Sequence, residues 1–386
     1  MTIFESFFLI FTSAAIVASL ALYTRQPLLV AYIVVGCALG PYGLAQIEDL
    51  NAVTEIAHIG IVFLLFLLGL DMQPSALRAV LGKATIIALA SSLVFGSTGF
   101  LLGLIFGFTP IESGVLAMAC LFSSTIIGIK LLPTTVLHHR HTGELMIGLL
   151  LLQDFIAIAC LLVLSSGESG GLDFTRLVTG VAALPLLAVG AVLMVKFILL
   201  PLFKRFDRFH EYIFLLAIGW CLGLAELGKL VGLSAEIGAF IAGISIATSP
   251  ISQYIALSLK PLRDFFLILF FFALGAQLNI DLLPQLIWPT LAVAAVILCI
   301  KPLTFKFLLG LQKEKSGLSW DVGFRLGQIS EFSLLVSFVA LEQELIGDRA
   351  ACLIQASAII TFIVSSYIVV FNFPNPIAVS DRLRRD

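Results

Sequence analysis

Long apolar runs constrain this chain more than any other feature. Residues 149–164, LLLLQDFIAIACLLVL, have the composition of a lipid bilayer interior apart from Gln153 and Asp154. About thirteen such runs follow one another between short polar loops, and each approaches the roughly 20 residues that cross a bilayer. Because 60% of the 386 residues are hydrophobic and 12% are charged, a water-soluble globular protein is excluded. The chain is predicted to be an all-α polytopic membrane protein, and nucleic acid is not an expected partner.

The predicted spans and their loops also give an orientation. The spans cover residues 6–23, 28–44, 53–70, 84–106, 111–131, 143–164, 177–200, 212–230, 235–248, 265–277, 283–309, 322–341 and 350–371. With the N-terminus outside, most of the 22 basic residues lie in or near the inner loops, whereas outer loops such as QIEDL and LEQELIGD are acidic. The positive-inside rule therefore predicts an outer N-terminus and a cytoplasmic C-terminus.

Asp154 is the residue that the bilayer should tolerate least. It lies near the middle of the sixth predicted span, where an isolated carboxylate costs roughly 2.5 to 3.5 kcal/mol on insertion scales. The side chains one helical turn away are apolar, so its partner must come from another span. One interpretation is a protonated carboxyl that ties two helices together. A water-accessible ion or proton site is the default interpretation for such a residue.

Two further spans carry polar clusters at a similar depth. Three consecutive hydroxyls supply oxygen ligands, and nearby glycines permit an unwound backbone whose carbonyls can bind a cation. Close helix packing by small residues is the alternative. The clusters correspond in position if spans three to seven and ten to thirteen are related halves, the pattern of inverted-repeat transporters with crossing broken helices. The residues are Ser123, Ser124 and Thr125 in the fifth span, and Gln328, Ser330 and Glu331 in the twelfth.

Several charged residues near the predicted span ends have two interpretations each. Lys301 lies one or two turns inside the eleventh span, where it either extends to the cytoplasmic face or forms a buried partner for a carboxylate. Arg325 enters the twelfth span with the same two possibilities. The histidines, including His58, are expected to be solvated loop residues, with pH sensing by the HHRH segment as the alternative. The six cysteines are dispersed in apolar runs and suggest neither disulfides nor a metal site.

Five segments in this order carry a family resemblance: SSTIIGIKLL, LLLLQDFIAI, SAEIGAFIAGISIA, FFFALGAQLNI and GQISEFSLL. Together they resemble the second monovalent cation:proton antiporter family, in particular its Kef-type potassium efflux branch. The resemblance covers nearly the whole chain. It implies a thirteen-span inverted-repeat fold with two crossing discontinuous helices, and a homodimer in which dimerisation and core subdomains interleave through residues 1–377.

The resemblance also implies roles for particular residues. Asp154 corresponds to the family's ion-carrying aspartate, and Lys301 to the lysine before the second broken helix. The QD pair resembles Kef-type members, because electrogenic sodium exchangers have two acidic residues there. Kef-type transporters usually continue into a cytoplasmic nucleotide-binding domain, but here only residues 378–386 follow, a short basic tail that is either natural or the stub of such a domain.

The expected function is exchange of a monovalent cation, K⁺ rather than Na⁺, for H⁺ in a bacterial inner membrane. Proton and cation would compete for Asp154, with Gln153, Ser123, Ser124 and Thr125 around it and Thr125 as a direct cation ligand. The expected supporting residues are Lys301, Glu331, Arg325, Gln328 and Ser330. No cofactor beyond the transported ions and no enzymatic activity are expected. The alternatives are a sodium–proton antiporter of the same fold, a potassium channel-like pathway, an intramembrane aspartyl protease and an assembly protein.

Overall fold

The computed structural model describes residues 3–24, 26–47, 51–71, 83–124, 141–165, 167–168, 171–172, 174–206 and 208–373, and almost all of them are helical. Eight helices in this part of the chain are long and apolar enough to cross a membrane, and three shorter ones are apolar as well. Each of the thirteen predicted ranges overlaps at least one helix, whereas thirteen membrane crossings remain a prediction. The two strands, β1 (Gly167–Glu168) and β2 (Gly171–Leu172), form one minimal antiparallel pair.

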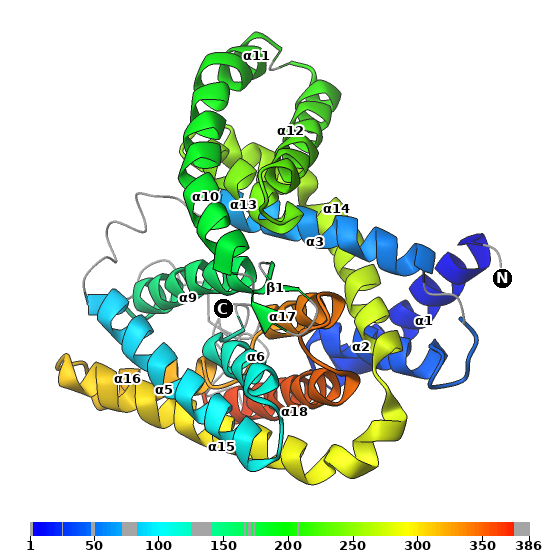
Figure 1. The fold of residues 1–386 in the computed structure, drawn as a ribbon, viewed down its shortest axis with the longest axis vertical. Helices are drawn as coiled ribbons and strands as arrows, with labels where there is room; N and C mark the ends of the chain where they lie inside the picture. The colour runs from blue at the N-terminus through cyan, green and yellow to red at the C-terminus, as the bar shows by residue number, and fades with distance from the viewer. Residues whose placement is uncertain are drawn as a thin grey trace.

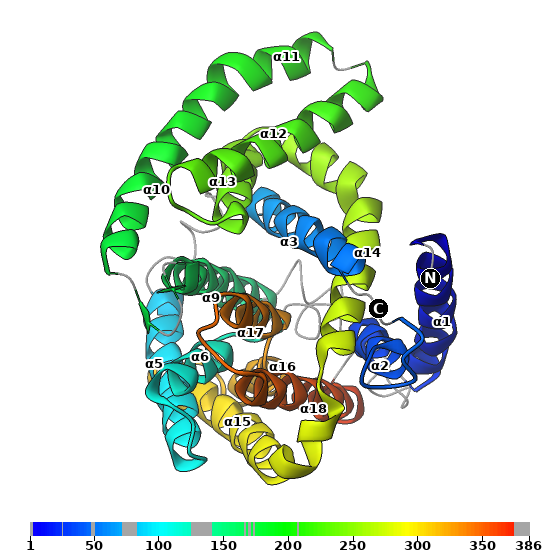
Figure 2. The ribbon, with the colours of Figure 1, turned by 45° about the vertical axis from the view of Figure 1, so that its right-hand side comes forward.

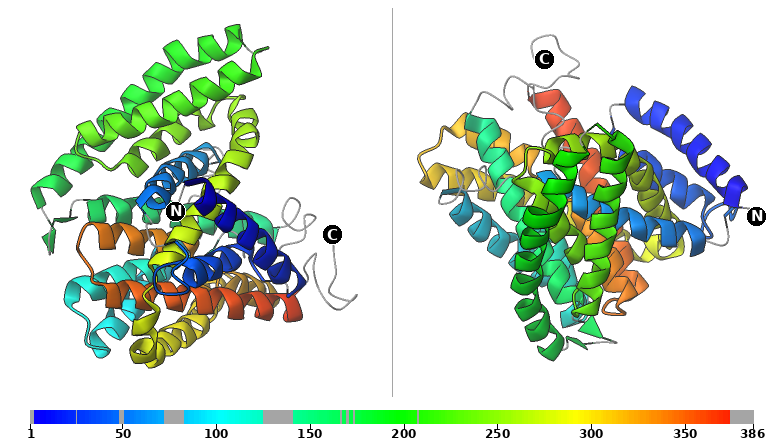
Figure 3. Two further views of the ribbon diagram at one scale, coloured as in Figure 1. Left: turned by 90° about the vertical axis from the view of Figure 1, so that its right-hand side faces the viewer. Right: turned by 90° about the horizontal axis from the view of Figure 1, so that it is seen from above.

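The helices fall into two groups by their contacts (Figures 1 and 2). In the scaffold group, α3 packs against α13 and α14, and α14 also packs against α2. Its members are α1 (Ile3–Tyr23), α2 (Leu28–Leu39), α3 (Asn51–Asp71), α10 (Phe174–Met194), the π-helical turn η1 (Val195–Leu199), α11 (Leu200–Arg205), α12 (His210–Leu230), α13 (Ala235–Ala247) and α14 (Ser252–Gln277). Helix α1 runs along the edge of the molecule (Figure 3).

The core group holds the polar clusters. It comprises α5 (Lys83–Ile105), α6 (Pro110–Leu121), α9 (His141–Ser165), α15 (Leu283–Leu311), α16 (Ser316–Arg325), α17 (Glu331–Glu342) and α18 (Asp348–Asn372), and the 3-10 turn η2 (Ile280–Leu282) leads into α15 from the scaffold group. Within the core group, α5 packs against α6 and α9, and α15 packs against α16 and α18. Helix α17 contacts α6, α9 and α18, which places it at the centre of the group.

Glycines allow the scaffold helices to touch backbone to backbone. A Cβ atom on Gly243 of α13 would lie 2.1 Å from the carbonyl oxygen of Phe66 in α3. A Cβ atom on Gly275 of α14 would lie 2.1 Å from the carbonyl oxygen of Ile33 in α2. Small residues at helix interfaces permit this approach, and the resulting close packing stabilises helix pairs where lipid supplies no hydrophobic driving force. A larger residue would not fit at Gly243 or Gly275, so these close contacts within the scaffold group require glycine.

Two predicted spans differ from the helices that the structure shows. The twelfth span, predicted at residues 322–341, is two helices, α16 and α17, separated by residues 326–330, so the interruption expected there is present. The tenth span was expected to begin at residue 265, but α14 begins at Ser252. The early part of α14 contains Lys260, Arg263 and Asp264, and these charges give it the composition of a loop although its backbone is helical.

Candidate functional site

The candidate site forms where the extended residues that follow α6 meet the interruption between α16 and α17. The first break, residues 122–124, follows α6, where Phe122 adopts an extended conformation. The second break, residues 326–330, separates α16 from α17. The hydroxyl of Ser123 donates a hydrogen bond of 2.8 Å to the Leu326 carbonyl, and the hydroxyl of Ser333 in α17 donates to the Ala119 carbonyl in α6. These bonds fasten the two breaks and their flanking helices to each other.

Local sequence explains why α17 starts where it does. The hydroxyl of Ser330 accepts a hydrogen bond from the Phe332 amide, and the hydroxyl of Ser333 accepts one from the Ser330 amide. This reciprocal capping satisfies amides that have no partner at a helix N-terminus. Ser330, predicted as a supporting residue of the site, is thus the N-cap of the second half-helix.

Lys301 is fully buried and links both breaks. Its Nζ donates to the carbonyl oxygens of Phe122, at 2.5 Å, and Gln328, at 3.0 Å, and it lies 3.5 Å from the hydroxyl of Ser123. The ammonium also sits over the Phe95 ring, 5.1 Å from the ring centroid. These contacts place a positive charge beyond the C-terminal ends of α6 and α16, where helix dipoles are negative. Lys301 therefore does not extend to solvent, and its described partners are main-chain carbonyls and a hydroxyl.

Gln328 provides the second link between the breaks. Its Nε2 donates to the carbonyls of Ser124, at 3.3 Å, and Arg325, at 2.9 Å, so one amide group spans both interruptions. Its Oε1 accepts a hydrogen bond of 2.9 Å from the hydroxyl of Ser365 in α18. Gln328 was predicted as a supporting residue, but Ser365 was not.

Helix α18 contributes hydroxyls that the motif analysis missed. The hydroxyl of Thr361 accepts a hydrogen bond of 3.2 Å from the Ile329 amide in the second break and donates to Ala358 in its own helix. Ser357 donates to the Thr290 carbonyl in α15. Ser357, Thr361 and Ser365 are four residues apart, so they share one helix face. That spacing is the signal from which they could have been found.

Gln153 and Asp154 approach this crossing from α9. The Oε1 of Gln153 accepts a hydrogen bond of 3.0 Å from the Ser123 amide, which has lost its helical partner. The Nε2 of Gln153 is buried and has no hydrogen-bond partner among the described residues. Asp154 is 6% exposed, and no described residue forms a hydrogen bond or an ion pair with it. Glu331, the first residue of α17, is close enough to act on Asp154 electrostatically.

Three predicted site residues remain, namely Arg325, Ser124 and Thr125. Arg325 is 1% exposed and pairs with Asp321 one turn earlier in α16, with 2.7 Å between Nε and Oδ1, so it does not extend to solvent. Ser124 is buried and presents its carbonyl to Gln328. Thr125 lies outside the described residues, so its role as a cation ligand stays a prediction.

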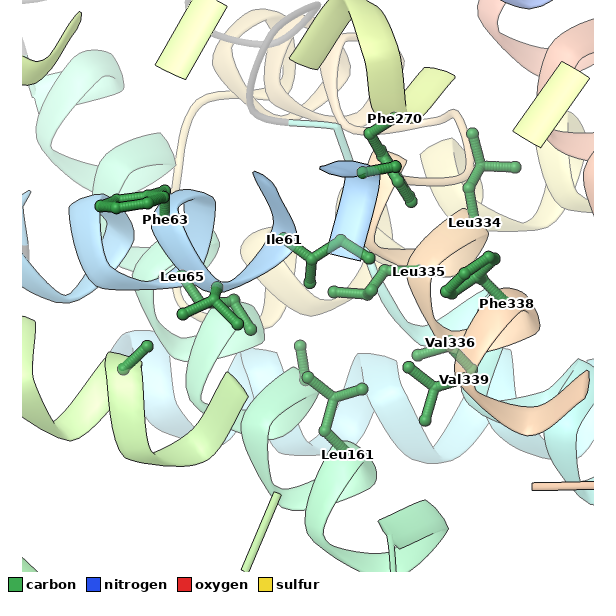
Figure 4. Close-up of a cluster of buried hydrophobic side chains, with 14 of the residues drawn as sticks. Ile61, Phe63, Leu65, Leu161, Phe270, Leu334, Leu335, Val336, Phe338 and Val339 are labelled. Carbon is green, nitrogen blue, oxygen red and sulfur yellow. The ribbon is translucent and has the colours of Figure 1, made fainter. Parts of the chain in front are cut away.

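Apolar side chains fill the space between the two helix groups on one side of Asp154. Figure 4 shows Ile61 and Leu65 of α3, Leu161 of α9, Phe270 of α14, and Leu335, Phe338 and Val339 of α17 meeting in one cluster, which we call the apolar seal. Leu161 follows Asp154 by two helical turns on the same face of α9. The apolar seal therefore lies about two helical turns beyond Asp154 along α9.

Comparison with known proteins identifies relatives over nearly the whole chain. The chain is 28% identical over 369 residues to the iron transporter MagA of Paramagnetospirillum magneticum, which covers 92% of this chain and 84% of that protein. It is 27% identical over 350 residues to the K(+) efflux antiporter 4 of Arabidopsis thaliana, which covers 88% of this chain but only 58% of that protein.

Solved structures show the same fold. The sodium proton antiporter MjNhaP1 from Methanocaldococcus jannaschii, solved at pH 8, superimposes with a TM-score of 0.68 over 95% of this chain and 100% of its own, at 18% identity. A structure of the same antiporter from an electron microscopy map gives a TM-score of 0.66 at 19% identity. The family model described as "Sodium/hydrogen exchanger, transmembrane" matches residues 8–372. The chain therefore belongs to the sodium/hydrogen exchanger family, whose members are integral membrane cation:proton antiporters.

Proposed function

We propose that this protein exchanges a monovalent cation, K⁺ in preference to Na⁺, for H⁺, and that Asp154 binds either ion. The observation that carries the proposal is a buried carboxyl beside two crossing breaks with no ion pair among the described residues. A permanent partner would have fixed its charge. A buried partner for a carboxylate was one interpretation of Lys301, but its amino group donates hydrogen bonds to the carbonyls of Phe122 and Gln328 instead.

The neighbourhood of Asp154 favours uptake of a positive ion. Glu331 acts on Asp154 electrostatically, and two negative charges in a buried region are stabilised when a cation or a proton joins them. Asp154 loaded with either ion has the same net charge, whereas the unloaded carboxylate carries a desolvation cost that opposes its passage between the two sides. Exchange of one ion for the other follows from that restriction.

Several carbonyl oxygens of the two breaks are already occupied, and this limits the ligands that a cation can use. The carbonyls of Phe122, Ser124 and Gln328 already accept hydrogen bonds from protein donors. The Oε1 of Gln153 likewise accepts from the Ser123 amide, so a cation at Asp154 takes its remaining ligands from the hydroxyls of Ser123 and Thr125 and from water. Neutral oxygen ligands around one carboxylate suit a large, weakly hydrated ion, and this favours K⁺. Among the relatives, one is named as a K(+) efflux antiporter and another as a sodium proton antiporter.

The proposal extends to the whole protein. Residues 1–377 form the transporter domain, which works as a homodimer in an inner membrane with its N-terminus outside and its C-terminus in the cytoplasm. Access to Asp154 alternates as the core group moves against the scaffold group, and the apolar seal closes one side.

Reconstitution into proteoliposomes with an internal pH-sensitive dye tests the proposal. Addition of K⁺, Na⁺ or Li⁺ to wild-type vesicles should move protons, most strongly with K⁺, and Asp154→Asn should abolish the signal for every cation. Asp281→Asn, an exposed aspartate at the start of η2 in the described chain, is the matched control and should retain full exchange. A correctly inserted Asp154→Asn protein that still exchanges would remove Asp154 from its role. Dissipation of a K⁺ gradient without proton movement would indicate a channel.

A further inference from the structure

The second break is held from one side by α18. Gln328 is fully buried, and its amide has two N–H donors and one carbonyl oxygen. The donors reach the Ser124 and Arg325 carbonyls, and the carbonyl oxygen accepts from the hydroxyl of Ser365. Every polar atom of this side chain is thereby engaged. Ser365 belongs to neither break. It lies in the continuous helix α18 and restrains the Gln328 amide from there.

Loss of the Ser365 hydroxyl would leave the Oε1 of Gln328 buried without its donor. A buried acceptor in that state is costly, and the side chain relaxes toward another donor where one is in reach. Any such movement of the amide would weaken its bonds to Ser124 and Arg325, which hold the two breaks together.

Thr361 acts on the backbone of the same break. The Ile329 amide lies between α16 and α17, where no helical carbonyl is available, and the hydroxyl of Thr361 accepts its hydrogen bond. The hydroxyl proton of Thr361 goes to the Ala358 carbonyl, so this hydroxyl is also fully engaged. One helix face thus supports the second break at two consecutive residues, Gln328 and Ile329.

We propose that Ser365 and Thr361 are positioning residues for the ion site, because they fix the geometry of the second break through Gln328 and Ile329. Their hydrogen bonds in the described chain go to Ile329, Ala358 and Gln328 and not to Asp154. The inference rests on the proposed function, since it assumes that the crossing breaks adjoin the ion site. If Ser365 and Thr361 act in this way, α18 influences the affinity for the cation although it lies outside the ion site.

The chain offers matched variants for the test. Ser365→Ala removes the donor to Gln328, and Thr361→Val removes the acceptor for Ile329 at nearly constant volume. Thr361→Ser restores the hydroxyl. Ser366→Ala is the control, because Ser366 is equally buried on the same helix but its hydroxyl has no hydrogen-bond partner among the described residues.

The measurement is the cation dependence of exchange in proteoliposomes, with KM and maximal rate determined separately. Ser365→Ala and Thr361→Val should each raise the KM for the cation by about three- to tenfold, the scale of one lost buried hydrogen bond. The maximal rate should stay within about twofold of wild type, a scale well below that of a lost hydrogen bond. Thr361→Ser should return the KM to near the wild-type value, and Ser366→Ala should leave it unchanged.

Two results would overturn the inference: a KM like that of Ser366→Ala in both variants, or a loss of maximal rate with no change in KM. If Ser365→Ala does not give a monodisperse protein, the Thr361 pair still decides the question. Failure of the proposed function is distinct, because wild-type vesicles would then show no exchange or Asp154→Asn would retain it. Retained wild-type KM with an inactive Asp154→Asn protein would refute only the role of α18.

Discussion

The Nε2 of His58 in α3 and the Oε1 of Glu342 at the end of α17 lie 2.9 Å apart, and the two side chains form an ion pair when His58 is protonated. The His58 ring also packs against Phe338 of the apolar seal, with 5.0 Å between ring centroids. Because α3 belongs to the scaffold group and α17 to the core group, the pair bridges the two groups at the edge of the seal. The expectation that His58 is a solvated loop residue was wrong, since it lies within α3.

The bridge predicts a pH-dependent restraint on transport. Protonation gives His58 a positive charge beside Glu342, so acidification on that side should hold the two groups together and slow exchange. Glu236 and Lys229 of the scaffold group also act on His58 electrostatically and contribute with opposite signs. His58→Gln should flatten the acidic limb of the pH–rate profile. The side chains of His58 and Glu342 are 31% and 44% exposed, so the effect should not exceed about fivefold, in line with partly exposed ion pairs.

The measurement is the exchange rate as a function of pH on the side of the membrane that His58 faces. Glu342→Gln should flatten the profile in the same way, and the double variant should add little to either single change, because both remove one interaction. Unchanged profiles in all three variants would show that the pair does not restrain the two groups.

Lys301 should be required for both stability and exchange. Lys301→Met removes the donor to the Phe122 and Gln328 carbonyls and leaves them buried, at a cost on the order of 2 to 3 kcal/mol or more. We expect a lower melting temperature in detergent, weaker exchange and a shifted pH dependence. Lys306→Met is the control, because Lys306 is exposed and lies over the Trp320 ring. Equal melting temperatures and pH profiles for the two variants would contradict a structural role for Lys301.

Gln153 should control how much charge is moved in each cycle. Gln153→Glu keeps an acceptor for the Ser123 amide but adds a negative charge beside Asp154. If the added charge travels with the site, each 100 mV of membrane potential changes the driving force by about 2.3 kcal/mol per charge. Transient currents on a solid-supported membrane should therefore appear in Gln153→Glu and be small in wild type. Gln153→Leu, which removes the acceptor and adds no charge, should lose activity without gaining current.

Gly243 should tolerate no side chain. A Cβ atom there would lie 2.1 Å from the Phe66 carbonyl oxygen, so Gly243→Ala forces α13 away from α3. Overpacking of this kind costs about 1 to 3 kcal/mol. The control is Gly223→Ala in α12, where no atom lies within 4 Å of the added Cβ. Melting followed by fluorescence-detected size-exclusion chromatography should show a fall for Gly243→Ala alone.

The sequence predicted the parts of this structure that depend on residue type. Clustered hydroxyls beside glycine predicted the interruption next to Ser330. An acid inside an apolar run singled out Asp154, which is buried in α9, and its role in ion binding stays a prediction. It did not predict the partners of Lys301, because those partners are carbonyls that every residue possesses. The pairing of His58 with Glu342 joins residues far apart in the chain, and only the folded arrangement reveals it.

The occupied carbonyls of the two breaks have a consequence for the empty protein. Unwound segments normally need an external charge to keep several carbonyl dipoles pointing inward against their mutual repulsion. Here the amino group of Lys301 donates hydrogen bonds to two of those carbonyls from within the fold. On the proposed function, the two breaks are therefore held together before a cation arrives, so that its binding does not have to order them.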